Sequence, residues 1–83
     1  MGYKQEPHYN IKMKSIHIKN IKKGQIFKEH DHEFVALEDA YISGALGKHS
    51  QYSVNGKHTA TGDVVEFMVT ETLEHYGPKL TIE

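Results

Sequence analysis

The sequence predicts a mainly β protein of a single small domain, with about five to seven short strands and at most one short helical turn. Apolar and polar residues alternate with a period of two in several segments, as they do in half-buried strands. Turn-forming residues recur at intervals of about ten, and no stretch has the periodicity of a three-turn helix. With 83 residues, of which 37% are hydrophobic, the chain suffices for one domain with a small core.

The first half of the chain contains two strand signals, one turn signal and one ambiguous stretch. Ile16 and Ile18 alternate with polar residues and predict a first strand. Gly24 supplies the flexible backbone of a turn, and the apolar run at residues 34–37 is long enough for a buried strand. Residues 38–47 fit either one helical turn or an irregular loop.

The strongest local signal is the pair Asn55 and Gly56, which lies between two strand-like segments, residues 51–54 and 57–60. Both central residues of a type I′ turn need positive φ, which Asn and Gly tolerate best. We therefore predict a hairpin turn at this pair.

The C-terminal third predicts a turn at residues 61–63, a β-branched and aromatic strand at 64–70, and a final edge strand at 79–82. Closure into a small barrel would remove unprotected strand edges. The expected architecture is therefore an SH3-like or OB-like barrel, or a strongly bent antiparallel sheet, formed by residues 13–83. Residues 1–12 contain Gly and Pro without periodicity, and we expect a flexible N-terminal arm or extension.

Charge is divided unevenly along the chain, although the net charge is only −1. Residues 1–28 carry seven lysines and one acid, a net charge of +6, whereas residues 29–83 carry three lysines and ten acids, a net charge of −7. Two surfaces of opposite sign would suit charged partners or self-association. The chain has no Cys, which excludes disulfides and thiolate metal sites. No apolar run approaches the ~18 residues of a membrane span, so we expect a cytoplasmic protein.

The basic N-terminal third, together with nearby aromatics, suggests a nucleic-acid-binding barrel as an alternative function. Cations would follow the phosphate backbone while aromatic rings stack on bases. The absence of Arg removes the usual bidentate contacts to phosphates and bases. The lysines that would carry this function are Lys14, Lys19, Lys22, Lys23 and Lys28.

Two histidines, His30 and His32, are spaced to share one face of an extended strand, where imidazoles two residues apart can hold a metal ion. The segment resembles the first metal motif of the cupins. That resemblance implies a ligand set of His30, His32 and Glu38, completed by His49 or His58. The alternative is a solvated polar turn, and we expect no cofactor.

Tyrosines in or beside the predicted loops suggest a protein-binding surface, because Tyr buries a large rigid area while keeping a polar end. Apolar residues accompany them in the stretch closed by Gly47. The alternative is that these side chains cap an open end of the barrel. The expected contact residues are Tyr41, Ile42, Leu46, Tyr52 and Tyr76.

No constellation typical of catalysis is present, so we expect a non-enzymatic protein. Residues 18–27, 34–39 and 76–80 resemble small β-rich accessory proteins of tailed bacteriophages. The resemblance implies a protein of the host cytoplasm that acts by binding, as an inhibitor or modulator of a host protein or defence complex. The leading hypothesis is thus a protein-interaction module whose partner is a host or other protein.

Overall fold

The computed structural model describes residues 13–70 and 77–83, which form seven strands and one 3-10 turn. The N-terminal arm predicted at residues 1–12 therefore lies outside the described residues. The elements are β1 (Lys14–Ile16), η2 (Ile18–Asn20), β2 (Ile26–Glu29), β3 (His32–Ala36), β4 (Tyr41–Leu46), β5 (His49–His58), β6 (Val64–Thr70) and β7 (Leu80–Ile82).

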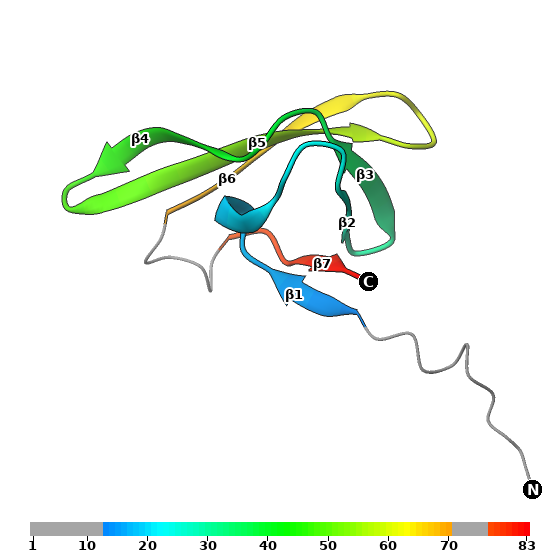
Figure 1. Cartoon of the computed structure of the whole chain (residues 1–83), viewed down its shortest axis with the longest axis horizontal. Helices are drawn as coiled ribbons and strands as arrows, with labels where there is room; N and C mark the ends of the chain where they lie inside the picture. The colour runs from blue at the N-terminus through cyan, green and yellow to red at the C-terminus, as the bar shows by residue number, and fades with distance from the viewer. Residues whose placement is uncertain (1–12, 71–76) are drawn as a thin grey trace, which may run out of the picture.

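All seven strands join one antiparallel sheet, in the order β1-β7-β2-β3-β5-β4, with β6 pairing β5 on its other edge. The sheet curls into a half-barrel, in which β1, β7, β2 and β3 bend round beneath the long β5 strand (Figure 1). This confirms the mainly β fold with one short helical turn and a strongly bent sheet.

The β5 strand holds the sheet together because it exchanges partners along its length. Its C-terminal part pairs β3, its N-terminal part pairs β4, and β6 follows it from Gln51 to Lys57. At the exchange point, Leu37 N–H donates to Asn55 O (2.9 Å) and Asn55 N–H donates to Glu38 Oε2 (2.6 Å). Asn55 lies between the part of β5 that pairs β3 and the part that pairs β4. The Glu38 carboxylate therefore accepts from the Asn55 N–H in place of a strand carbonyl.

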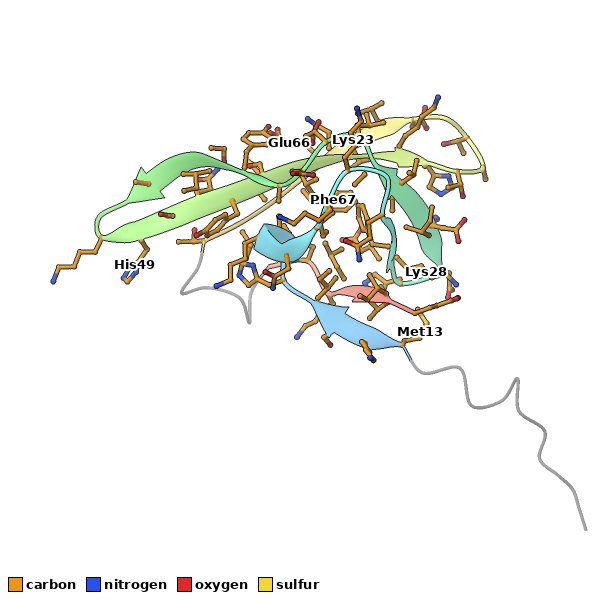
Figure 2. The ribbon with its side chains drawn as sticks, viewed as in Figure 1. Met13, Lys23, Lys28, His49, Glu66 and Phe67 are labelled. Carbon is orange, nitrogen blue, oxygen red and sulfur yellow. The ribbon has the colours of Figure 1, made fainter. Side chains whose placement is uncertain are left out.

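The core lies inside the curl and is built on three phenylalanines from three strands. Phe34 packs on Phe27 and Phe67 with ring centroids 5.7 Å and 4.9 Å away, and Phe27 meets Phe67 edge-on at 5.3 Å. Figure 2 labels Phe67 between η2 and the curled strands. The buried hydrophobic residues are Ile18, Ile21, Phe27, Phe34, Ala36, Val54, Phe67, Val69 and Leu80.

The predicted hairpin turn at Asn55 and Gly56 is wrong, because both residues lie within the ten-residue strand β5. Gly56 is required for space rather than for a turn: a Cβ built on it would lie 2.7 Å from Phe27 Cζ and 3.1 Å from Phe34 Cβ. A glycine inside a strand often marks such a close approach. The chain turns instead between β5 and β6, where Gly62 has a φ of 81°, as residues 61–63 predicted.

Three further expectations need correction, while the Gly24 turn (φ 84°) and the 64–70 strand are confirmed. Residues 38–47 were expected to hold a helical turn or an irregular loop, but only residues 38–40 are irregular; the rest is the whole of β4 and the Gly47 turn (φ 63°). Ile18 lies in η2, after β1 has ended. The predicted C-terminal edge strand is an interior strand, since β7 pairs both β1 and β2.

Candidate functional site

The β4 strand stands apart from the rest of the sheet because none of its residues from Tyr41 to Ala45, whose burial the structure describes, belongs to the core. Every side chain from Tyr41 to Ala45 is exposed, and Ile42 is 62% exposed. A register shift between Ile42 and Gly44 marks a β-bulge at Ser43. β4 pairs β5 beyond the point where β3 ends, so the two strands form an arm that projects from the curl (Figure 1).

The arm has two faces, and the predicted contact residues are divided between them. Ile42 lies opposite Tyr52 in the register, on the face that continues the core. Tyr52 is half-buried, and its ring meets the His17 ring edge-on at 5.9 Å. Tyr41 lies opposite Ser53 on the other face. The structure thus brings Ile42 and Tyr52 together and separates Tyr41 from them.

The two remaining contact residues are less informative. Leu46 ends β4 and lies opposite His49 in the register; its side chain is not described. Tyr76 lies outside the described residues.

The face of the arm that carries Tyr41 and Ser53, called the outer face from here on, is held in place by polar contacts. Ser53 is fully buried, and its Oγ lies 2.5 Å from Ser43 Oγ at the bulge. The Gln51 amide donates to Ser43 Oγ and to Met68 Sδ, both at 3.2 Å. These contacts join β4, β5 and β6, so the exposed apolar side chains of the arm are presented on an ordered base.

Tyr41 also belongs to this outer face. Its hydroxyl donates to Glu66 Oε2 at 3.4 Å. Desolvation first, and then the charges of Glu66 and Glu38, raise the pKa of Tyr41 above its ordinary value.

Sequence reasoning missed a second group of exposed hydrophobic residues, Val64, Val65 and Met68 on β6. Their strand was predicted, but which of its side chains would be exposed was not. Glu66 was the available signal, because a charge flanked by Val64 and Met68 at two-residue spacing indicates one solvated face.

The histidines predicted as metal ligands lie in and beside the β2–β3 turn. His30 occupies the turn itself with a φ of 55°, so it does not continue the strand alternation that would align it with His32. His32 Nδ1 lies 3.1 Å from His58 Nε2 on β5. Among the residues that the structure describes, histidines and acids do not gather in any group of three that would hold a metal ion.

Hydrogen bonding assigns the protons of the His32–His58 pair. His58 Nδ1 accepts from the N–H groups of Ala60 and Thr61, both at 3.2 Å, so its proton resides on Nε2 and is donated to His32 Nδ1. A metal at His58 Nε2 would displace this proton. The pair therefore clamps the β5–β6 turn, while Glu38, the third ligand implied by the cupin resemblance, is engaged at Asn55 N–H.

The five lysines considered for nucleic-acid binding are spread over four places: β1, η2, the following turn and β2. Lys23 and Lys28 lie well apart in Figure 2. Acidic groups accompany both, since Lys23 N–H donates to Asp39 Oδ1 (2.8 Å) and Lys28 lies opposite Glu33 in the register. The five lysines therefore come from several elements, and acidic residues lie beside two of them.

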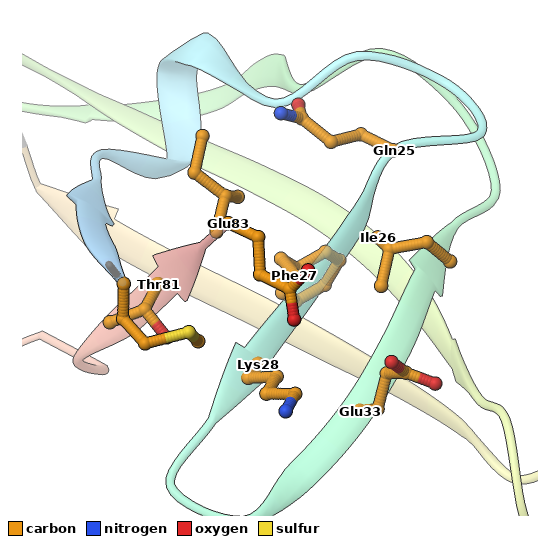
Figure 3. Close-up of a pocket in the computed structure, with 9 residues that line it drawn as sticks. Gln25, Ile26, Phe27, Lys28, Glu33, Thr81 and Glu83 are labelled. Atoms are coloured by element: carbon orange, nitrogen blue, oxygen red, sulfur yellow. The ribbon is translucent and has the colours of Figure 1, made fainter. Parts of the chain in front are cut away.

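An open groove of about 410 Å³ lies along β2, β3 and β7 (Figure 3). Its charged lining is mixed, with Lys28 beside the carboxylates of Glu33 and Glu83, and Ile26 supplies apolar surface. The groove does not include the exposed residues of β4 or β6.

No protein-family profile matches the chain, and comparisons with curated proteins and with solved structures also find no match. Within residues 13–70 and 77–83, the structure contains no helix with the length and hydrophobicity to span a bilayer.

Proposed function

We propose that this protein is a non-enzymatic interaction module that binds a partner protein through the β4–β5 arm, with Ile42, Tyr52 and Tyr41 as contact residues. In the setting that the phage resemblance implies, the partner is a host protein or defence complex whose activity is modulated by binding.

The observation that carries this proposal is an ordered strand without a buried side chain among those described. Fixing the backbone of a residue costs about 1–2 kcal/mol, which core strands recover by burying apolar surface. From Tyr41 to Ala45, β4 recovers little in this way, and it holds Ile42 in solvent. Binding a partner would bury that surface.

The surface has the composition of an interaction site. Ile42 and Tyr52 form an apolar and aromatic pair on one face, and Tyr41 supplies an aromatic ring on the other. Tyrosine is enriched among the residues that dominate binding energy. The bulge at Ser43 protects the outer edge of β4 from strand addition, so its side chains rather than its backbone are offered to a partner.

The test is affinity capture from a bacterial lysate with the wild-type protein and two isoleucine variants. Ile42→Asp places a charge on the arm, whereas Ile26→Asp places the same charge on β2 at a comparably exposed residue (47% against 62%). We expect at least one protein to be retained by the wild type and by Ile26→Asp and lost with Ile42→Asp. Equal retention by Ile42→Asp, or no retained protein at all, would contradict the proposal.

A further inference from the structure

Three strand edges are open among the described residues, and they differ in protection. β1 has only three residues and carries Lys14, and β4 is interrupted by its bulge. Short length, lysine and bulges all discourage the addition of another strand. β6 has seven regular residues with neither Lys nor Pro, and Glu66 is its single charge. β6 is therefore the edge that is best suited to accept a strand.

The hydrogen-bond pattern identifies which backbone groups this edge offers. His58 N–H donates to Asp63 O at 2.7 Å, which makes Lys57 and Val64 a non-hydrogen-bonded pair. Because such pairs alternate with hydrogen-bonded ones, the N–H and C=O groups of residues 65, 67 and 69 face β5. The groups of Val64, Glu66, Met68 and Thr70 face the open edge.

We propose that the β6 edge pairs antiparallel with the β6 edge of a second copy of this chain, about a two-fold axis at Phe67. The self-association uses β6 and so differs from the partner binding proposed for β4. In this register, Glu66 lies opposite Met68 of the second copy, and Val64 lies opposite its Thr70.

Charge and alternation select this register over its neighbours. Open-edge residues must face open-edge residues, so the register changes only in steps that move the axis by one residue. An axis at Glu66 would place two like charges directly opposite each other, which is destabilising. An axis at Met68 would leave Val64 without a partner among residues 64–70. The axis at Phe67 pairs four open-edge residues from each copy and keeps the two Glu66 carboxylates diagonal.

Burial supports the same pairing. Val65 lies on the inner face with Phe67, yet it is exposed because the sheet ends at β6. In the proposed register, Val69 of the second copy lies opposite Val65 and covers it. A domain of this size has a small core, and association is a common way to extend one.

Cysteine cross-linking tests the proposal directly, because the chain has no native Cys. In a hydrogen-bonded pair the Cα atoms lie about 5.5 Å apart, a separation that a disulfide spans. Glu66→Cys and Met68→Cys are prepared separately, one with a size tag, and oxidised alone and as a mixture. Glu66 and Met68 are both exposed, so neither change disturbs the core.

We expect a disulfide-linked mixed dimer from the mixture and little dimer from either variant alone. Ile26→Cys is the control, since its exposure (47%) matches that of Met68 (49%) and it lies on β2. A dimer from Glu66→Cys alone would mean an axis at Glu66, and one from Met68→Cys alone an axis at Met68; either overturns the proposal. So does cross-linking no greater than that of Ile26→Cys.

Analytical ultracentrifugation of the native chain provides the second measurement. Met68→Lys adds the charge that protects natural edges, and we expect it to weaken dimer association by about tenfold or more, while Ile26→Lys leaves it unchanged. A wild-type chain that stays monomeric at every concentration would overturn the proposal. Because Ile42 is not altered, capture of a partner through β4 would still be measurable, which separates the two proposals.

Discussion

The β3 and β4 strands pair with the same edge of β5, one after the other, yet they differ in how far their side chains are buried. β3 buries Phe34 and Ala36, whereas β4 buries none of its described side chains from Tyr41 to Ala45. The difference arises from the curl of the sheet, which carries β3, β2 and β7 round beneath β5 but leaves β4 on the projecting arm (Figure 1). Pairing with β5 therefore holds β4 in the arm, whereas the burial of β3 side chains in the core depends on the curl of the sheet.

The largest expected difference in stability between β3 and β4 comes from removing one apolar side chain from each strand. Phe34→Ala should lower the free energy of unfolding by about 3–5 kcal/mol, because Phe34 packs on Phe27 and Phe67 in the core. Ile42→Ala should change it by about 0.5 kcal/mol or less, because Ile42 lies in solvent. Urea denaturation measures both values. A loss of more than about 2 kcal/mol for Ile42→Ala would show that β4 is part of the core after all.

A second test adds a methyl group in each region. Gly56→Ala places a Cβ against Phe27 and Phe34 and should destabilise the fold by about 1–3 kcal/mol through overpacking. Gly44→Ala on β4 meets nothing closer than Gln51 Oε1 at 3.9 Å, so we expect no destabilisation and a gain of up to about 1 kcal/mol. Thermal unfolding followed by circular dichroism compares them. Equal melting temperatures for the two variants would contradict the close approach at Gly56.

Gly56 also shows where sequence reasoning fails. The pair Asn-Gly is a strong turn signal because of its φ preference, but a glycine can also be needed for the room that its missing side chain leaves. The second need arises from Phe27, which is 29 residues earlier in the chain, so no local pattern reveals it. The turn at Gly62 and the strand at residues 64–70 were predictable because local signals alone decide them.

The candidate site was predicted only in part, because some of its features also depend on residues that are distant in the chain. Exposed Tyr41 and Ile42 were recognised from residue type, although they were assigned to a loop instead of a strand. The division of Tyr41 from Ile42 depends on pleating and on the Ser43 bulge, which appear only once the register with β5 is known. The open edge of β6 likewise depends on which strands become its neighbours, a property of topology that one sequence does not encode locally.

A third prediction concerns the point where β5 exchanges β3 for β4. Glu38→Ala removes the carboxylate that accepts from Asn55 N–H and should destabilise the fold by about 1–2 kcal/mol, because a part-buried donor loses its partner. Glu38→Gln keeps an acceptor and should cost less. Asp31→Ala, in the exposed β2–β3 turn, serves as the control. Denaturant unfolding orders the three variants, and equal stability of Glu38→Ala and Asp31→Ala would exclude this role for Glu38.

The smallest effect is expected on the outer face of the arm, in the titration of Tyr41. Desolvation, followed by the charges of Glu66 and Glu38, raises its pKa, so the neutral phenol is favoured by the fold. The stability that this contributes is present below the ordinary tyrosine pKa and is lost as pH rises through the raised value. NMR of the tyrosine ring carbons, assigned with Tyr41→Phe, follows the ionisation. Glu66→Gln removes one of the two charges and leaves a neutral, weaker hydrogen-bond acceptor, so it should lower the pKa of Tyr41 toward its ordinary value, while Glu33→Gln on β3 should leave it in place. An unchanged titration in Glu66→Gln would mean that β6 does not hold Tyr41, and that the arm is joined through Ser43, Gln51 and Ser53 alone.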